Sequence, residues 1–156
     1  MTHAMNEPLE DSTVVPALSR HVADAAVLYQ RLRAFHWMIR GNAFFQLHAF
    51  FEEQYDFWAQ ATDDLAERML ALGGRPPLTL REILATASLG ERSPRAAAGE
   101  MIRQYRDDLR HLRDALAATI TAAEAEGDRA TVNLLDGLRD NAEKTLWMLG
   151  AFLSGD

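Results

Sequence analysis

The sequence predicts an all-α fold, a four-helix bundle with a short extra helix in the connection between the second and third long helices. Three observations predict it. Apolar residues recur at helical spacing over four long segments. Glycine and proline are few and clustered, so they mark the ends of these segments. No segment shows the alternation of apolar and polar residues that is typical of a strand. Each long helix would hold about 25–30 residues and measure about 40 Å.

The first two long helices are predicted on either side of Gly41. Residues 1–14 are polar and acidic, and we expect them to form a mobile tail. Pro16 suits the first turn of a helix, which then continues as far as Gly41. Asn42 can cap the next helix, which is expected over about 43–72. A Gly-Gly pair and a Pro-Pro pair directly after this segment keep the second helix from continuing.

Capping patterns predict the start of the next two helices. Thr79 and Glu82 form a capping box that opens a short helix, which ends before the Leu-Gly pair at 89–90. Ser93 is a candidate N-cap, because Pro94 follows it at the first helical position. From there the third long helix is expected to run to about residue 126.

Asp128 can cap a fourth long helix that runs to about residue 153. Residues 15–156 are therefore expected to form one domain, since a chain of this length normally makes a single domain. The long connection allows the second and third long helices to run parallel, which requires a crossover.

The composition excludes several classes of protein. Cysteine is absent, which excludes a disulfide scaffold, a thiolate zinc site, an iron–sulfur cluster and a cysteine nucleophile. No apolar stretch approaches the ~20 residues that span a bilayer, and the first residues lack the features of a signal peptide. We therefore expect a cytoplasmic protein. The net charge of −7 does not favour non-specific binding to the DNA backbone.

Five histidine and acidic residues have ligand atoms that suit iron, manganese or zinc. They are His36, His48, Glu52, Asp63 and Glu67. On a helical wheel the four that belong to the second helix share one stripe, which borders the apolar face of that helix. Residues in this position are well placed for an interface between chains.

The axial distances exclude one shared site within a single chain. Glu52 and Asp63 are about 16 Å apart along the helix, and His48 and Glu67 are about 28 Å apart. If a second copy packs antiparallel across a two-fold axis, the pair His48/Glu52 of one chain faces the pair Asp63/Glu67 of the other. The spacing therefore suggests two equivalent metal sites between two chains, with His36 completing the histidine side.

The residue types alone also fit an ordinary structural interpretation. Histidines on the apolar side of a helix are commonly core or boundary residues, and an acidic pair one turn apart is commonly a solvated face. Acids are abundant in this part of the chain, since Glu53, Asp56 and Asp64 lie beside the candidate ligands. From composition and spacing alone, both interpretations stay open.

Several motifs together resemble the Dps family, the DNA-binding proteins from starved cells or miniferritins. The segments that carry the resemblance are FHWMIRG at 35–41, FFQLH at 44–48, DDLAERMLALGG at 63–74 and KTLWMLGAFL at 144–153. The resemblance covers about residues 15 to 153. It implies a ferritin-like bundle that assembles into a hollow dodecamer with twelve ferroxidase sites at two-fold interfaces.

Carried over residue by residue, the resemblance implies that His36, His48 and Glu52 come from one subunit. Asp63 and Glu67 would come from the two-fold mate, with Glu67 bridging two irons. Many members of the family have aspartate where this chain has Glu52. The site would take iron in a di-iron or mono-iron arrangement, with zinc as a substitute.

The resemblance also implies a reaction. Such a site oxidises Fe(II) to Fe(III), with hydrogen peroxide preferred over dioxygen, and the shell stores the ferric mineral. Trp37 is a candidate electron donor that intercepts radicals, or else a packing residue at the dimer interface. Glu124 and Asp128 are candidates for lining an acidic three-fold pore. The alternative is a solvated turn in which Asp128 acts only as a helix cap. Trp58 and Trp147 are expected in the core or at interfaces.

The alternative function, compaction of the nucleoid, finds little support in the charge pattern. Residues 1–19 and the C-terminal Ser-Gly-Asp contain neither lysine nor arginine. Twelve copies of a chain with a charge of −7 would repel the phosphate backbone. We therefore expect weak DNA binding or none. His3, His21 and His111 are expected in the tail or on helix surfaces.

Overall fold

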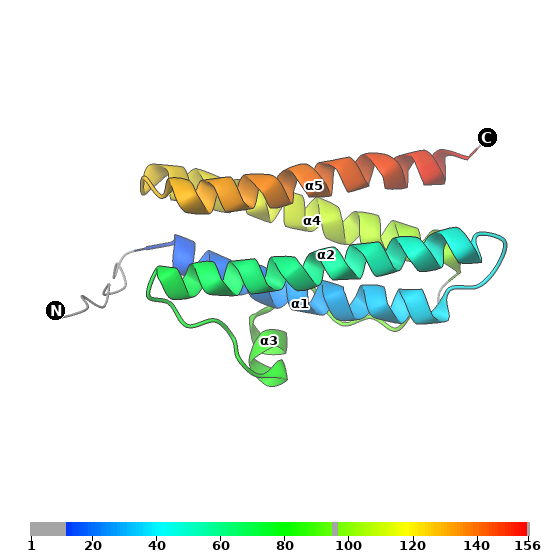
Figure 1. Ribbon diagram of the computed structural model, residues 1–156, viewed down its shortest axis with the longest axis horizontal. Coiled ribbons are helices and arrows are strands. Elements are labelled where there is room, and N and C mark those ends of the chain that lie inside the picture. Colours follow the sequence, from blue (N-terminus) through cyan, green and yellow to red (C-terminus); the bar gives the residue numbers. More distant parts are fainter. Residues whose placement is uncertain (1–11, 95–96, 156) are drawn as a thin grey trace.

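Five helices and no strands make up the part of the chain that the computed structural model describes, residues 12–94 and 97–155 (Figure 1). The helices are α1 (Val14–Met38), α2 (Phe44–Ala71), α3 (Leu80–Thr86), α4 (Ala98–Ala125) and α5 (Arg129–Ser154). The four long helices form the bundle and the short α3 lies beside it. The predicted fold class is therefore confirmed.

The connection between α2 and α4 is the predicted crossover. Figure 1 shows α1 and α2 antiparallel, joined by a short loop at one end of the bundle. After α3 the chain returns along the bundle to that same end, and α4 then runs in the same direction as α2. The last helix, α5, runs back beside α4. None of the helices in the described ranges is long and apolar enough to span a membrane.

The core lies between the apolar faces of the four long helices. Its largest fully buried side chains include Phe35 of α1, Phe51 of α2 and Tyr105 of α4. The expectation that Trp58 is a core residue is confirmed: it is buried, and its indole N–H donates to the Tyr105 hydroxyl at 3.1 Å. That hydroxyl donates in turn to the side-chain carbonyl of Gln54. The buried polar atoms of this group thus satisfy one another.

Two of the predicted helix starts are wrong. Asn42 does not cap α2; Ala43 occupies the N-cap position, and the loop closes through a hydrogen bond from the Phe44 N–H to the Gly41 carbonyl. Gly41 has φ +102°, a conformation that glycine adopts without strain, so the turn needs no side-chain cap. Ser93 does not open α4 either, because this helix begins at Ala98. Residues 90–94 have no regular secondary structure.

Other predicted boundaries are confirmed by their capping contacts. The Thr79 hydroxyl accepts a hydrogen bond from the Glu82 N–H, and the Glu82 carboxylate accepts one from the Thr79 N–H, so the capping box is complete. The Asp128 carboxylate accepts from the Thr131 N–H and caps α5. Of the predicted tail, residues 1–11 lie outside the described residues, and α1 begins at Val14.

Buried polar side chains of α1 and α4 hold the crossover against the bundle. The Asp24 carboxylate accepts hydrogen bonds from the N–H groups of Ser88 and Leu89 at 2.7 and 2.9 Å, and from the Ser88 hydroxyl at 2.6 Å. The Arg31 guanidinium forms a buried ion pair with Asp108 and also donates to a crossover carbonyl, that of Gly90. Asp24, Arg31 and Asp108 are buried, so each needs a hydrogen-bond or ion-pair partner within the chain. These hydrogen bonds and the ion pair supply those partners.

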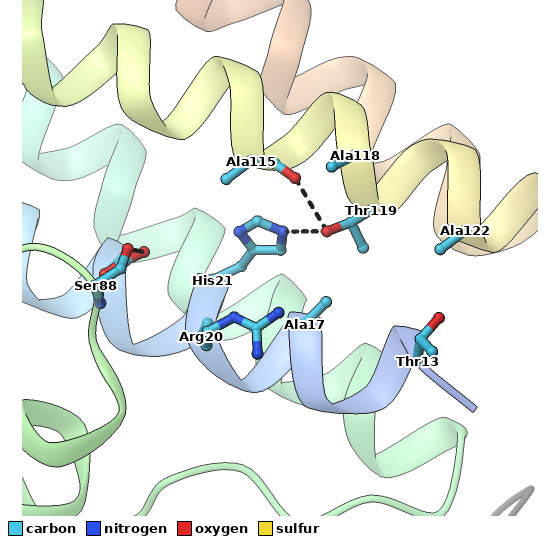
Figure 2. A pocket seen from close by; sticks show the side chains of 10 residues that line it. Thr13, Ala17, Arg20, His21, Ser88, Ala115, Ala118, Thr119 and Ala122 are labelled. Carbon is cyan, nitrogen blue, oxygen red and sulfur yellow. Dashed lines mark hydrogen bonds between the residues drawn. The ribbon is translucent and has the colours of Figure 1, made fainter. Parts of the chain in front are cut away.

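The expectation that His21 lies on a helix surface is wrong. His21 is only 5% exposed, and its Nε2–H donates to the Thr119 hydroxyl at 2.8 Å, since that hydroxyl donates to the carbonyl of Ala115 (Figure 2). The ring lines a cavity of about 280 Å³ between α1 and α4. Burial lowers the pKa of His21 to about 4, although the nearby Asp24 carboxylate partly opposes the shift.

We predict an acid-dependent loss of stability that comes from His21. The unfolded chain binds a proton near pH 6.5, whereas the folded chain does so only near pH 4. The contribution is therefore complete above pH 6.5 and is lost as the pH falls towards 4, by up to about 3 kcal/mol per chain. Thermal unfolding of wild type and His21→Gln between pH 7 and 4 measures it. An equally steep pH dependence in His21→Gln would contradict the assignment.

The ion pair of Arg31 and Asp108 gives a second prediction. Replacing Arg31 by leucine leaves the Asp108 carboxylate buried without its charge partner, and we expect a loss of about 3 kcal/mol in the free energy of unfolding. The double variant Arg31→Leu/Asp108→Leu should recover part of that loss, because no unpaired charge remains. Chemical denaturation of the three proteins measures this coupling, and additive losses would show that the two charges do not depend on each other.

Candidate metal centre

Two histidines meet where the turn at Gly41 joins α1 to α2. His36 lies in the last turn of α1 and His48 in the second turn of α2. His36 Nδ1 lies 2.7 Å from the carbonyl oxygen of His48, and His48 Nδ1 lies 2.8 Å from the carbonyl oxygen of His36. The two rings stack with their centroids 3.7 Å apart and their planes 16° apart. The structure therefore brings the two candidate ligands His36 and His48 side by side.

The reciprocal hydrogen bonds determine which ring nitrogen can bind a metal. A carbonyl oxygen only accepts, so Nδ1 of each histidine must carry the proton. Each neutral ring then has an unprotonated Nε2 with a free lone pair, as is typical of histidines that bind metals. Each ring could therefore hold a metal ion through its Nε2 atom.

Aromatic side chains pack around the histidine pair. Phe44 stacks on His48 with ring centroids 4.9 Å apart and planes 18° apart. Tyr55 meets the His36 ring edge-on, at 5.3 Å and 86°. His36 is 9% exposed. The neighbouring rings therefore fix the orientation of both imidazoles and keep much of the histidine pair away from water.

Sequence analysis missed Phe44 and Tyr55 as neighbours of the metal ligands. Their positions carry a signal: Phe44 lies four residues before His48 and Tyr55 seven residues after it, so all three share one helix face. Partial burial raises the pKa of Tyr55, and the carboxylates of Glu52 and Asp56 act in the same direction. The phenol is therefore protonated at neutral pH.

The candidate acidic ligands lie exposed along α2. This helix is unbroken from Phe44 to Ala71, so the helical rise used in the sequence analysis applies over its whole length. Glu52 lies one turn beyond His48, whereas Asp63 and Glu67 lie near the opposite end of the helix. Within the described part of the chain, no three His, Cys, Asp or Glu side chains come close enough to hold a metal ion together.

The remaining sequence-derived candidates lie in different environments. Trp37 is 57% exposed, and the Arg33 guanidinium lies 4.9 Å from the centroid of its ring. Trp147 is 70% exposed on α5, so it is not in the core of one chain. Glu124 is exposed at the end of α4.

Asp128 has partners within the chain. Its carboxylate caps α5 through Thr131 and forms an ion pair with Arg68 at 2.7 Å. Burial by itself would raise the pKa of Asp128, but the Thr131 hydroxyl and N–H and the Arg68 guanidinium together hold it below its ordinary value. The ion pair between Arg68 and Asp128 links the end of α2 to the start of α5.

An apolar surface lies where α3 faces α1. None of the residues of α3 is buried, and Leu80 and Leu84 are 80% and 48% exposed. A cavity of about 590 Å³ separates α3 from α1, and both leucines line it together with Tyr29 and Arg33. Exposed apolar groups of this kind are typical of surfaces that contact another chain.

Comparisons with known proteins show the family to which this chain is similar. The family model for the ferritin-like domain matches residues 15–155. General stress protein 20U of Bacillus subtilis is 39% identical over 140 residues, which is 90% of this chain and 97% of that protein. The crystal structure of a Dps protein from Bacillus brevis superimposes with a TM-score of 0.89 at 37% identity, covering 98% of this chain and 99% of that one.

A third similar protein is described by the chemistry of its superfamily. The Dps protein of Vibrio cholerae O1, described as a member of a broad superfamily of ferritin-like diiron-carboxylate proteins, has a TM-score of 0.89 at 30% identity. It covers 97% of this chain and 99% of that one. With a family match over nearly the whole chain, and with relatives this similar in sequence and fold, the chain belongs to the ferritin-like family and, within it, to the Dps proteins.

Proposed function

We propose that this chain assembles into a hollow dodecamer that oxidises Fe(II) to Fe(III), with hydrogen peroxide as the preferred oxidant, and stores the ferric mineral. The observation that carries the proposal is the position of two ligand pairs on one unbroken helix. His48 and Glu52 lie towards one end of α2, where His36 of α1 meets them, and Asp63 and Glu67 lie towards the other end. Along the helix, His48 and Glu67 are about 28 Å apart. The expectation that such a shell is cytoplasmic stays a prediction.

A second copy of the chain would complete each site. In an isologous two-fold interface each contact between the two chains occurs twice. An antiparallel pair of α2 helices therefore places one acidic pair opposite each histidine pair. The apolar side chains of Trp37, Leu80 and Leu84 are exposed on the single chain, as is typical of surfaces that a partner covers. In this arrangement His36, His48 and Glu52 act with Asp63 and Glu67 of the partner chain.

The donor set suits Fe(II), which accepts both imidazole nitrogen and carboxylate oxygen. Two ferrous ions that neighbour each other can each give one electron to hydrogen peroxide, whose O–O bond then breaks to yield water. The two-electron step leaves no hydroxyl radical, which explains how such a protein would protect a cell. The carboxylate of Glu67 can bridge two ions, and zinc can occupy the same ligands.

Iron would reach the cavity of the shell through acidic pores. We propose Glu124 and Asp128 as residues that line them, since both lie at the turn between α4 and α5. The Glu124 carboxylate is exposed and can attract cations directly. Asp128 would contribute less charge, because Arg68 already neutralises it within the chain.

The ligand assignment predicts how substitutions affect iron oxidation. In His36→Ala/His48→Ala the histidine side is lost, and in Asp63→Ala/Glu67→Ala the acidic side is lost. Each variant is expected to oxidise Fe(II) with peroxide at least about tenfold more slowly than wild type, because no complete site remains. Stopped-flow ferric absorbance after anaerobic loading measures the rate. Glu53→Ala/Asp64→Ala removes two neighbouring acids outside the ligand set and is the matched control; an equal loss in this control would contradict the assignment.

Mixing the two inactive variants tests whether the sites are shared. If each site takes histidines from one chain and acids from its mate, shells assembled from equal amounts of both variants regain about one quarter of the sites. Such a site pairs intact histidines with intact acids. Sites formed within one chain would regain nothing. Co-refolded shells, checked by native mass spectrometry for composition, are compared with each variant alone, and absence of recovery in mixed shells would refute shared sites.

The second candidate function, compaction of DNA, is suggested by relatives named DNA protection during starvation protein, such as that of Brevibacillus brevis. We predict weak binding or none, because the chain carries −7 and six of the acids lie on α2 alone. A gel shift with supercoiled plasmid at neutral pH and low salt measures it. Retention of the plasmid by micromolar shells would contradict this prediction.

A further inference from the structure

Tyr55 is the side chain that contacts the imidazole of His36 edge-on, at 5.3 Å between ring centroids. The ring of Tyr55 is partly exposed and belongs to the same helix as the candidate ligands Glu52 and Asp63. We propose that Tyr55 supplies the second electron to hydrogen peroxide when a site holds only one Fe(II). This inference rests on the proposed ferroxidase function and adds to it a route that needs no second iron.

The chemical need for such a donor follows from the electron count. Hydrogen peroxide needs two electrons and two protons to become two molecules of water, whereas one Fe(II) gives a single electron. The missing electron comes from the phenol of Tyr55, whose O–H bond breaks to give a tyrosyl radical and a proton. In total, H2O2, Fe(II), the phenol and one proton yield Fe(III), the tyrosyl radical and two H2O. The proton leaves to solvent, because Tyr55 is partly exposed.

The charges around the neighbouring rings favour Tyr55 over Trp37 and Tyr29. The guanidinium of Arg33 lies over both of these rings, 5.2 Å from the centroid of Tyr29 and 4.9 Å from that of Trp37. A cation on the face of an aromatic ring is attracted to its electrons, so removal of an electron from that ring becomes harder. Tyr55 has a different environment, since its charged neighbours are first the carboxylates of Glu52 and Asp56 and only then Arg33.

The same charges keep the radical near the site. Tyr29 meets Tyr55 edge-on at 5.9 Å, so the two rings are close enough to exchange an electron. Because Arg33 makes oxidation of Tyr29 less favourable, the radical is expected to stay on Tyr55. Packing also supports Tyr55 as the first donor, because its ring contacts the imidazole of the candidate ligand His36 directly.

Freeze-quench electron paramagnetic resonance tests the proposal. Assembled protein is loaded anaerobically with one Fe(II) per site and mixed with hydrogen peroxide. We expect a radical signal that narrows when the protein contains ring-deuterated tyrosine and is unaffected by ring-deuterated tryptophan. The signal should be lost in Tyr55→Phe, which keeps the ring packed on His36, and retained in Tyr29→Phe and Trp37→Phe. A spin trap should detect more hydroxyl radical in Tyr55→Phe than in wild type.

Other outcomes overturn the inference. A signal that narrows with deuterated tryptophan, a tyrosyl signal that survives in Tyr55→Phe, or the absence of any protein radical each contradicts it. If Tyr55→Phe does not fold, the isotope experiments on wild type and the Tyr29→Phe and Tyr105→Phe variants still decide among the three tyrosines of the chain. Ferric absorbance with two Fe(II) per site is measured on the same wild-type sample. Normal oxidation without a radical overturns the role of Tyr55 alone, whereas no oxidation overturns the proposed function with it.

Discussion

The rise of an α-helix is the constraint on which the arrangement of this protein depends. α2 is unbroken from Phe44 to Ala71 and carries four of the five candidate ligands, so the distances between them are set by the backbone and not by side-chain choice. A carboxylate can extend its reach by a few ångströms, but it cannot cross the length of several turns. The histidine and acidic ends of α2 therefore act in different places, and a shared site requires two helices.

The histidine end of α2 is organised before any metal arrives. Each of His36 and His48 donates Nδ1–H to the other's carbonyl, and the two peptide groups lie on different helices. The turn at Gly41 brings those helices together, and Phe44 and Tyr55 complete the packing around the rings. The fold thus sets the orientation of both rings, and such an arrangement would lower the cost of binding an ion in a fixed geometry. The acidic side chains Asp63 and Glu67, in contrast, are exposed on the single chain.

Buried polar contacts hold the crossover against the bundle. Asp24 and Arg31 of α1 bind residues 88–90, and Asp108 of α4 pairs with Arg31. The crossover is thereby held along the bundle towards the end at which α4 begins. This arrangement makes α2 and α4 parallel and leaves α3 outside the bundle, with its leucines exposed. The apolar surface of α3 is therefore a consequence of the topology.

By itself, the sequence determined the five helices, the crossover, the capping box of Thr79 and the separation of the ligand pairs, because helical periodicity, capping and rise are local properties of the chain. Only the tertiary structure decided that His21 is buried, that α4 starts after Ser93-Pro94, and that Tyr55 contacts His36. These three features depend on which helix faces pack together and on how many residues the crossover needs to span the bundle. Contacts between residues far apart in sequence leave no local pattern from which they could be predicted.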